Sequence, residues 1–293
     1  MKIKTAVILS SGVIAISFAA ILIRLSTAPP LIISFYRMLF SVVLLTPVVV
    51  HSEDIRRQIQ WLSGRDVFLL LIAGIFLSIH FALWVTSLNH TSVASSVVLV
   101  TTQPLFIVVI ENFFLRKKPS RKLVGGLIVA GVGSLLIGYG GFSTSHVKFL
   151  GDVFALLGAG MAAGYFLIGG EVRKRIKLIP YVYVVYGVSA IFLLLYSVVG
   201  RLPLVRYSPY NYLMFFLLAA GPTMVGHTSF NWVLKEVNAS LVGVTLLAEP
   251  VGSSILAALM FGEYPSYWTI VGGSLVLISI YFLWRSELFE GLG

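Results

Sequence analysis

Apolar residues fill this chain in runs of about 20, and short stretches between the runs hold most of its charges, prolines and turn residues. A helix needs roughly 20 apolar residues to cross a bilayer, whereas the strands of a membrane β-barrel alternate over about ten residues. The pattern therefore predicts an all-α integral membrane protein with ten transmembrane helices. We expect them at about 5–24, 30–50, 66–88, 91–115, 123–141, 150–171, 179–200, 211–234, 239–262 and 266–285.

The composition agrees with this prediction, since 58% of the 293 residues are hydrophobic and 11% are charged, unlike an average soluble domain. Cysteine is absent, which excludes disulfides, thiolate metal ligands and a cysteine nucleophile. We predict no metal and no cofactor. The first apolar run resembles a signal peptide, but it continues to Arg24, which is long enough to span a bilayer, so we expect it to remain as the first helix.

The distribution of Lys and Arg predicts the orientation. The net charge of +10 does not indicate nucleic-acid binding, because these residues lie in the connectors. With the N-terminus in the cytoplasm, sixteen fall inside, four fall outside and Arg37 lies within a helix. Short basic loops resist translocation, so we predict a multi-pass protein of the plasma (inner) membrane with both termini cytoplasmic. The sixteen are Lys2, Lys4, Arg56, Arg57, Arg65, Arg116, Lys117, Lys118, Arg121, Lys122, Arg173, Lys174, Arg175, Lys177, Lys235 and Arg285, and the four are Arg24, Lys148, Arg201 and Arg206.

The two halves of the chain share a skeleton at a constant shift of 146 residues, which pairs Pro104 with Pro250. Each half, 1–146 and 147–293, contains five predicted helices, and the odd number turns the second half upside down relative to the first. Such inverted repeats are typical of secondary transporters, because a site between the repeats can open to either side. A duplicated membrane scaffold without transport is the alternative.

Four stretches of the chain resemble the EamA-type, ten-helix branch of the drug/metabolite transporter (DMT) superfamily. They are ILIRLSTAPPLIISFYRMLF, HFALWVTSLNHTSVASSVVLVTTQP, GHTSFNWVL and LLAEPVGSSILAALMFGEYPS. The resemblance covers the whole chain and implies a carrier rather than an enzyme, with helices of both halves around a central cavity and the fifth and tenth helices at the periphery. It does not specify a substrate, since the branch includes exporters of amino acids and of other metabolites.

Glu249 is the most informative polar residue in the apolar runs. At ~1.5 Å rise per residue it lies ~15 Å deep in the ninth helix, and Gln103 is its repeat partner in the fourth. An ionisable group at such a depth indicates a functional site. Pro104 and Pro250 each remove an N–H and loosen the helix there, which frees carbonyls for a polar solute. We predict a polar site at the repeat interface; a hydrogen-bonded, protonated Glu249 beside a proline kink used for packing is the alternative.

Other polar residues extend this candidate site. Arg37 lies ~10 Å inside the second helix, where it would bind a substrate carboxylate bidentately, pair with Glu249 or reach outward to the headgroups. Helical spacing places Thr245 on the face of Glu249, and each histidine is read either as a binding group or as an interhelical hydrogen bond. The candidate residues are Glu249, Gln103, Arg37, His80, Trp84, His227, Asn231, Tyr165, Tyr186 and Thr245, with Pro104 and Pro250 as helix-loosening residues.

Together these features predict a secondary transporter that exports or exchanges a small polar or amphipathic metabolite by alternating access. From the resemblance, an amino acid is the leading cargo. The predicted partners are this small molecule and the lipid bilayer, and a homodimer is left open. A multidrug pump for hydrophobic cations is one alternative, which Arg37 opposes by its charge. A membrane enzyme acting on lipids is another, which would need His80 or His227 at a membrane–water boundary. Proton coupling through Glu249 and facilitated diffusion both remain open.

Overall fold

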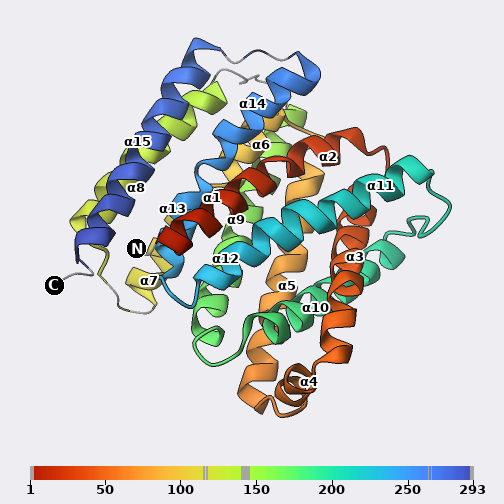
Figure 1. Cartoon of the computed structure of the whole chain (residues 1–293). Helices are drawn as coiled ribbons and strands as arrows, with labels where there is room; N and C mark the ends of the chain where they lie inside the picture. Colours follow the sequence, from red (N-terminus) through yellow and green to blue (C-terminus); the bar gives the residue numbers. More distant parts are fainter. Residues whose placement is uncertain are drawn as a thin grey trace.

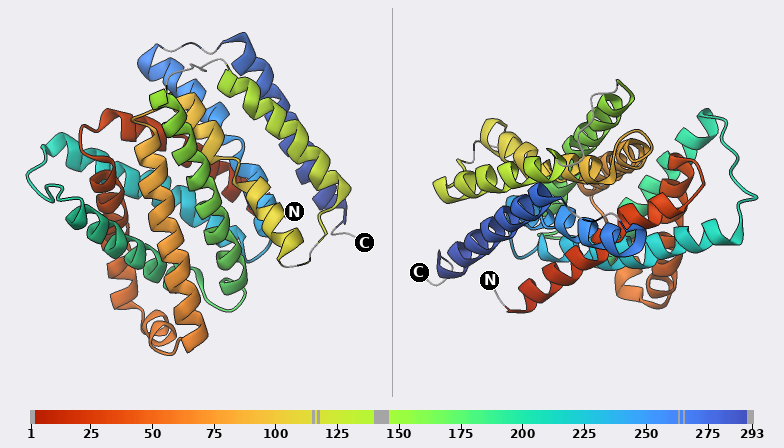
Figure 2. Two further views of the ribbon diagram at one scale, coloured as in Figure 1. Left: turned by 180° about the vertical axis from the view of Figure 1, so that it is seen from behind. Right: turned by 90° about the horizontal axis from the view of Figure 1, so that it is seen from above.

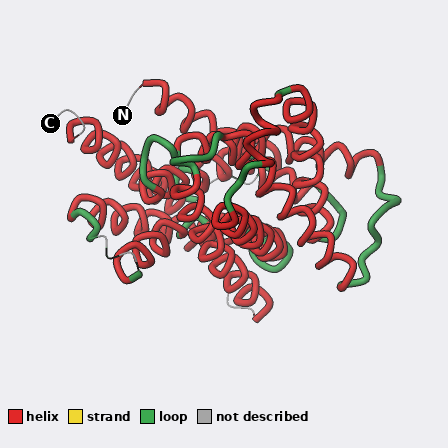
Figure 3. The backbone as a smooth tube through the Cα atoms, turned by 90° about the horizontal axis from the view of Figure 1, so that it is seen from below, coloured by secondary structure: helices red, strands yellow, loops and turns green. Residues whose placement is uncertain are grey.

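The structure is a computed structural model that describes residues 3–114, 116, 118–139, 146–262, 264 and 266–290. Lys2 and Lys117, which contribute to the predicted charge bias, lie outside these ranges. Within them all regular secondary structure is helical and no strand occurs (Figure 3). The predicted all-α membrane protein is therefore confirmed.

Ten helical passes traverse the molecule (Figure 1). Nine of those in the described ranges are long and apolar enough to cross a membrane, and the tenth is α8, a 19-residue helix that opens on two basic residues. Each predicted range overlaps one pass. The passes are α1–α2 (Ile3–Ser17, Ala19–Leu25), α3 (Pro30–His51), α5 (Gly64–Ser87), α6–α7 (Val93–Val100, Gln103–Phe113), α8 (Arg121–Tyr139), α9 (His146–Val172), α10 (Leu178–Val199), α11–η1–α12 (Pro209–Leu218, Ala219–His227, Thr228–Val233), α13–α14 (Ala239–Leu246, Glu249–Phe261) and α15 (Tyr267–Glu290).

Several passes differ from the single continuous helices that the apolar runs predict. The first is interrupted at Phe18, and the fourth and ninth are interrupted just before Pro104 and Pro250. The eighth contains η1, a π-helix. A short helix without a predicted counterpart, α4 (Glu53–Gln60), lies between α3 and α5 and buries none of its residues.

The connectors gather at two ends of the molecule. At one end Lys177 Nζ donates to Asp54 Oδ2 at 2.6 Å, and Arg175 Nε donates to Asp66 Oδ1 at 2.7 Å. The bond to Asp66 raises the pKa of the Arg175 guanidinium, so this ion pair keeps its cation at any physiological pH. We call this end the basic face. It is the face that the charge bias predicts to be cytoplasmic.

The other end, which we call the opposite face, joins different connectors. The Tyr36 hydroxyl donates to the Leu204 carbonyl at 2.8 Å, and Ser26 Oγ donates to Asn211 Oδ1 at 2.8 Å. The N-terminal end of α1 and the C-terminal end of α15 lie on the same side of the molecule in every view (Figures 1 and 2). An even number of passes requires this arrangement.

The contact between α8 and α15 displays the inversion of the repeats directly. The two helices lie alongside each other at the edge of the bundle (Figure 2). Ser279 Oγ donates to the Gly126 carbonyl at 2.7 Å, and a Cβ on Gly133 would lie 2.5 Å from the Gly272 carbonyl oxygen. A shift of 146 residues exchanges these two contacts, because it takes 126 to 272 and 133 to 279. The chain therefore consists of two inverted five-helix repeats, with the fifth and tenth passes paired at the periphery.

Repeat-related caps also start the fourth and ninth passes. The Ser92 side chain accepts a hydrogen bond from the Ser95 N–H at 3.1 Å, and the Asn238 side chain accepts one from the Leu241 N–H at 3.1 Å. Ser and Asn are preferred N-caps because their side chains satisfy backbone donors that the first turn leaves free. Ser92 and Asn238 are 146 residues apart, so both breaks are reached after the same length of helix.

Single cysteines in this cysteine-free chain test the predicted orientation. Lys174→Cys lies at the basic face and Ser208→Cys at the opposite face. A membrane-impermeant thiol reagent added to intact cells should label Ser208→Cys, and it should reach Lys174→Cys only after the membrane is opened. Labelling of Lys174→Cys in intact cells would reverse the orientation, and labelling of both positions from one side would show that α10 does not cross the membrane.

Candidate functional site

The fourth and ninth passes break at the same level of the two repeats. α7 starts at Gln103 and α14 at Glu249, and each of these residues is followed by a proline, Pro104 or Pro250. Proline has no N–H, and its ring clashes with the carbonyl four residues earlier in a continuous helix. The preceding helix therefore ends, and the proline falls in the first turn of the next one, where a missing N–H costs nothing.

At each break, one backbone carbonyl loses the N–H group that would donate to it in a continuous α-helix. The carbonyls of Val100 and Leu246 would accept from the residues four positions on, but both of these are prolines without an N–H. Val100 and Leu246 line one and the same cavity, together with Gln103 and Glu249. Both members of two repeat-related pairs therefore meet at a single place inside the bundle.

This central cavity is narrow. Its volume is about 20 Å³, enough for about one water molecule. Five of the ten candidate site residues line it, and they come from both repeats. The lining residues are Ile16, His80, Trp84, Val100, Thr101, Gln103, Phe166, His227, Leu246 and Glu249.

Three of the lining side chains have a buried polar atom without a hydrogen-bond partner among the described residues: Trp84 Nε1, His227 Nδ1 and Glu249 Oε1. His80 differs, since its Nδ1 lies 2.9 Å from the Gly158 carbonyl oxygen and its ring stacks on Trp84 with centroids 6.0 Å apart. A buried polar atom without a partner costs roughly 1–3 kcal/mol. These three atoms are therefore the ones that a polar ligand would satisfy.

Arg37 lies behind the cavity wall and does not line it. Its side chain is 0% exposed, Nε donates to Thr223 Oγ1 at 2.7 Å, and the guanidinium carbon lies 4.2 Å from the ring centroid of Phe81. Phe81 in turn packs edge-on against His227, with centroids 5.3 Å apart. The two terminal guanidinium nitrogens have no hydrogen-bond partner within the described part of the chain. One aromatic ring thus separates this cation from the cavity wall.

Asn231, Tyr165 and Tyr186 form a second polar cluster. Asn231 Nδ2 donates to Tyr165 Oη at 2.5 Å and to Tyr186 Oη at 3.4 Å, and Tyr186 Oη lies 3.1 Å from Thr228 Oγ1. Asn231 is one helical turn beyond His227 toward the basic face. The cluster therefore adjoins the cavity on that side without lining it.

Thr245 does not line the cavity that Glu249 lines. Between the two residues the helical turn tightens, since the Leu247 N–H donates to the Val244 carbonyl and the Ala248 N–H to the Thr245 carbonyl, both at 3.1 Å. The Thr245 hydroxyl accepts from Trp284 Nε1 at 3.0 Å and donates to the Leu241 carbonyl at 2.9 Å. Thr245 therefore anchors α13 to the peripheral α15.

The π-helix η1 places Thr223 and His227, and the apolar run alone does not reveal it. Hydroxyls here bond carbonyls five residues back, from Thr223 to Leu218 at 3.1 Å and from Thr228 to Thr223 at 3.0 Å. Pro222 lies inside η1, and a proline within a helical run is the sequence signal that would have indicated an irregularity. Short π-helical segments are frequent at functional sites.

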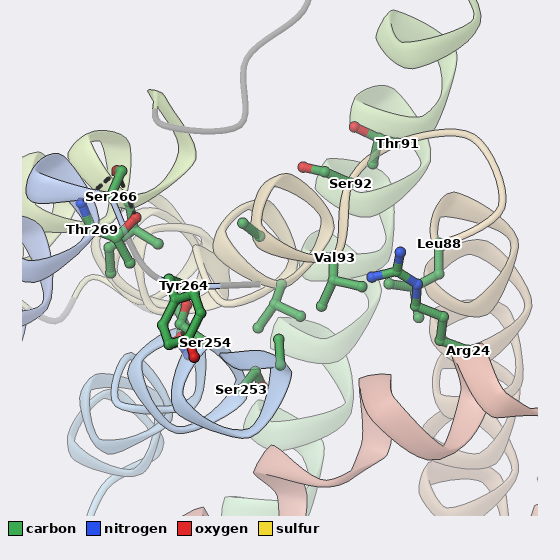
Figure 4. A pocket seen from close by; sticks show the side chains of 15 residues that line it. Arg24, Leu88, Thr91, Ser92, Val93, Ser253, Ser254, Tyr264, Ser266 and Thr269 are labelled. Carbon is green, nitrogen blue, oxygen red and sulfur yellow. Dashed lines mark hydrogen bonds between the residues drawn. The ribbon is translucent and has the colours of Figure 1, made fainter. Parts of the chain in front are cut away.

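Two larger pockets open at the two faces. The opposite vestibule has a volume of about 370 Å³, and Figure 4 shows Arg24, Ser253, Ser254 and Tyr264 around it. The basic vestibule has a volume of about 340 Å³. The first is lined by Arg24, Leu88, Thr91, Ser92, Val93, Ala94, Val97, Ile137, Pro250, Ser253, Ser254, Ala257, Tyr264, Ser266 and Thr269, and the second by Glu111, Leu167, Gly170, Glu171, Lys174, Leu234, Lys235, Glu236, Val237, Asn238 and Ala239.

The two vestibules are related by the repeat. A shift of 146 residues takes six positions that line the opposite vestibule to six that line the basic vestibule. Along the fourth and ninth passes, the residues that line the central cavity come between those that line the two vestibules. The related pairs are Arg24 and Gly170, Leu88 and Leu234, Thr91 and Val237, Ser92 and Asn238, Val93 and Ala239, and Glu111 and Ala257.

A narrow polar cavity at the junction of two inverted repeats is the architecture of a membrane carrier. The chain belongs to the EamA-like transporter family, whose model matches it twice, over residues 2–139 and 149–285. The predicted resemblance to EamA-type carriers of the DMT superfamily is thereby confirmed, and the family points to a transporter rather than an enzyme.

Individual relatives agree with this assignment. A protein of Archaeoglobus fulgidus named uncharacterized transporter is 24% identical over 282 residues, which cover 93% of this chain and 95% of the relative. One of the same name from Clostridium kluyveri is 25% identical over 254 residues, or 82% and 78% of the two chains. A crystal structure that is 18% identical shares the fold, with a TM-score of 0.77 over 97% of both chains.

The burial of Arg37 predicts an unusual effect on stability. Replacing buried ionic groups by apolar ones of similar size is often neutral or stabilising by about 1–4 kcal/mol. Arg37→Met should therefore unfold in detergent at the same temperature as the wild type or above it. Thr223→Val, which leaves the guanidinium Nε without its acceptor, should unfold at a lower temperature. A large loss of stability in Arg37→Met would mean that this arginine is a structural residue that holds α3 to η1.

Proposed function

We propose that the protein is a secondary transporter that moves a small polar metabolite by alternating access. The observation that carries the proposal is the relation between the vestibules: two pockets of similar volume, related by the repeat, lead from opposite faces toward one central cavity. If the two repeats exchange their conformations, the central cavity that was open through one vestibule becomes open through the other. Export or exchange of this metabolite is the proposed mode of transport.

The cavity must widen to hold cargo. Its volume of about 20 Å³ is far below the 300 Å³ or more of typical ligand pockets. Rotation of the Phe81 and His227 rings would join the space around Arg37 to the cavity. The bound site would then present a guanidinium, an indole N–H and a carboxylate to the cargo.

This set of groups fits an amino acid or a related organic acid. The two unpartnered nitrogens of Arg37 match the two oxygens of a carboxylate. Glu249 Oε1, also unpartnered, would accept from an ammonium group. A hydrophobic cation would be attracted by Glu249 but repelled by Arg37, so a multidrug pump fits these residues less well.

Glu249 is also the group that would couple transport to protons. A carboxyl held away from water prefers its neutral form, so binding and release of a proton at Glu249 would accompany its exposure to either face. Facilitated diffusion, the alternative, needs no titrating group. A panel of metabolites offered to proteoliposomes with and without a pH gradient tests the proposed function as a whole.

Glu249→Gln separates coupling from binding. The amide keeps the size of the side chain and removes its charge, so transport driven by a pH gradient should be lost while the protein still folds and inserts. Counterflow of labelled cargo without a gradient should persist at a reduced rate. Unchanged gradient-driven transport in Glu249→Gln would make Glu249 a structural hydrogen-bonding residue.

Arg37 tests the class of cargo. Loss of a charge-assisted hydrogen bond costs on the order of 1.5–3 kcal/mol, so Arg37→Ala should weaken binding of a carboxylate cargo by roughly tenfold or more. Arg37→Lys should restore it only in part, because an ammonium lacks the planar fork. The control is the same cargo as its neutral amide, which should bind wild type poorly and be indifferent to the substitution. Equal losses for carboxylate and amide would remove the support that Arg37 gives to an amino-acid cargo.

A further inference from the structure

The two vestibules share six related lining positions, and their chemistry differs at several of them, among them Glu111 and Ala257. The basic vestibule is bordered by Glu111 on α7, and Ser240 on α13 directly follows its lining residue Ala239. The shift of 146 residues takes these two positions to Ala257 and Ala94 in the opposite vestibule. The same place in the repeat thus carries a carboxylate and a hydroxyl at one face and two methyl groups at the other.

The carboxylate and the hydroxyl bond each other. Ser240 Oγ donates to Glu111 Oε2 at 2.5 Å, and Ser240 is 1% exposed. The bond ties α13 to α7 across the repeat interface. A hydroxyl bound to a carboxylate forms a stronger hydrogen bond than two neutral groups do. Two alanines at the opposite face offer only van der Waals contact.

A second bond of the same type lies at the basic face. Thr5 Oγ1 donates to Glu236 Oε2 at 2.6 Å, and Thr5 is 1% exposed. This bond ties α1 to the connector 234–238, which lines the basic vestibule. The related positions are Gly151 and His90, and a glycine there has no side chain with which to bond. The connector at the opposite face therefore lacks this anchor too.

We infer that Glu111–Ser240 and Thr5–Glu236 form a latch that holds the basic vestibule closed toward the central cavity. The inference rests on the proposed alternating access, and it adds that the two faces differ in how firmly their vestibules are held closed. For the basic vestibule to deepen to the cavity, α13 must move away from α7 and the connector 234–238 away from α1. Both bonds break in that step. The alanine pair at the opposite face imposes no such barrier, so the empty carrier rests open to that face.

Thiol accessibility measures this equilibrium without any cargo. Leu167→Cys reports on the basic vestibule and Ser254→Cys on the opposite one. In the variant that combines Thr5→Val with Ser240→Ala, which lack the hydroxyls but nearly keep the volumes, labelling of Leu167→Cys should speed up by at least tenfold and that of Ser254→Cys should slow down. Glu236→Gln, a change at an exposed residue, should give a smaller shift in the same direction. Ser189→Ala, a buried serine outside both vestibules, should change neither rate.

The Glu–Ser pair of the latch can also be introduced at the opposite face. Adding Ala94→Ser and Ala257→Glu to the variant without the latch should protect Ser254→Cys and expose Leu167→Cys further. Unchanged labelling in a monodisperse Thr5→Val, Ser240→Ala protein would overturn the latch, even if the wild type transports in proteoliposomes. A shift in labelling supports the latch even if no metabolite of a broad panel is transported, and that second result would count against the proposed function alone.

Discussion

The candidate site of this carrier depends on how the buried guanidinium of Arg37 is held. A cation in the interior of a membrane protein costs several kcal/mol unless it is paired, yet Arg37 has one acceptor, Thr223, and a ring face, Phe81. Its two terminal nitrogens are without partners among the described residues, as is an oxygen of Glu249. A guanidinium and a carboxyl group are thus held close to one cavity without a direct bond between them. A cargo that carries complementary groups relieves this cost when it binds, and the relief is available to stabilise the bound state.

The repeat places the cavity where both halves control it. Pro104 and Pro250 end their helices at the same level, so two broken helices bring Gln103 and Glu249 to one wall. The vestibules at the two faces share six related positions of the two repeats, and the same shift exchanges the contacts of α8 with α15. Function then depends on departures from this symmetry: Glu249 of one repeat corresponds to Gln103 of the other, and the Glu111–Ser240 bond corresponds to two alanines.

The passes could be predicted because a run of about 20 apolar residues has few other uses, and the inversion followed from an odd number of passes. The lining of the cavity by His80, Trp84 and Glu249 could be anticipated from depth alone. Spacing along the helix did not reveal that the hydroxyl of Thr245 binds Trp284 of the peripheral α15 and does not line the cavity. Depth also could not distinguish a residue in the cavity wall from one behind it, such as Arg37. That difference depends on the π-helical turn of η1 and on the ring of Phe81, which are tertiary features.

Distances across the two vestibules, measured under the same conditions, test alternating access most directly. Spin labels at Ser92 and Tyr264 would span the opposite vestibule, and labels at Lys174 and Asn238 the basic one, in two separate double-cysteine proteins in liposomes. Alternating access predicts two distances, one short and one long, for each pair of labels. Conditions that raise the population of the long distance across one vestibule should lower the population of the long distance across the other. A single, unchanging distance across both vestibules, with cargo and without it, would contradict alternating access.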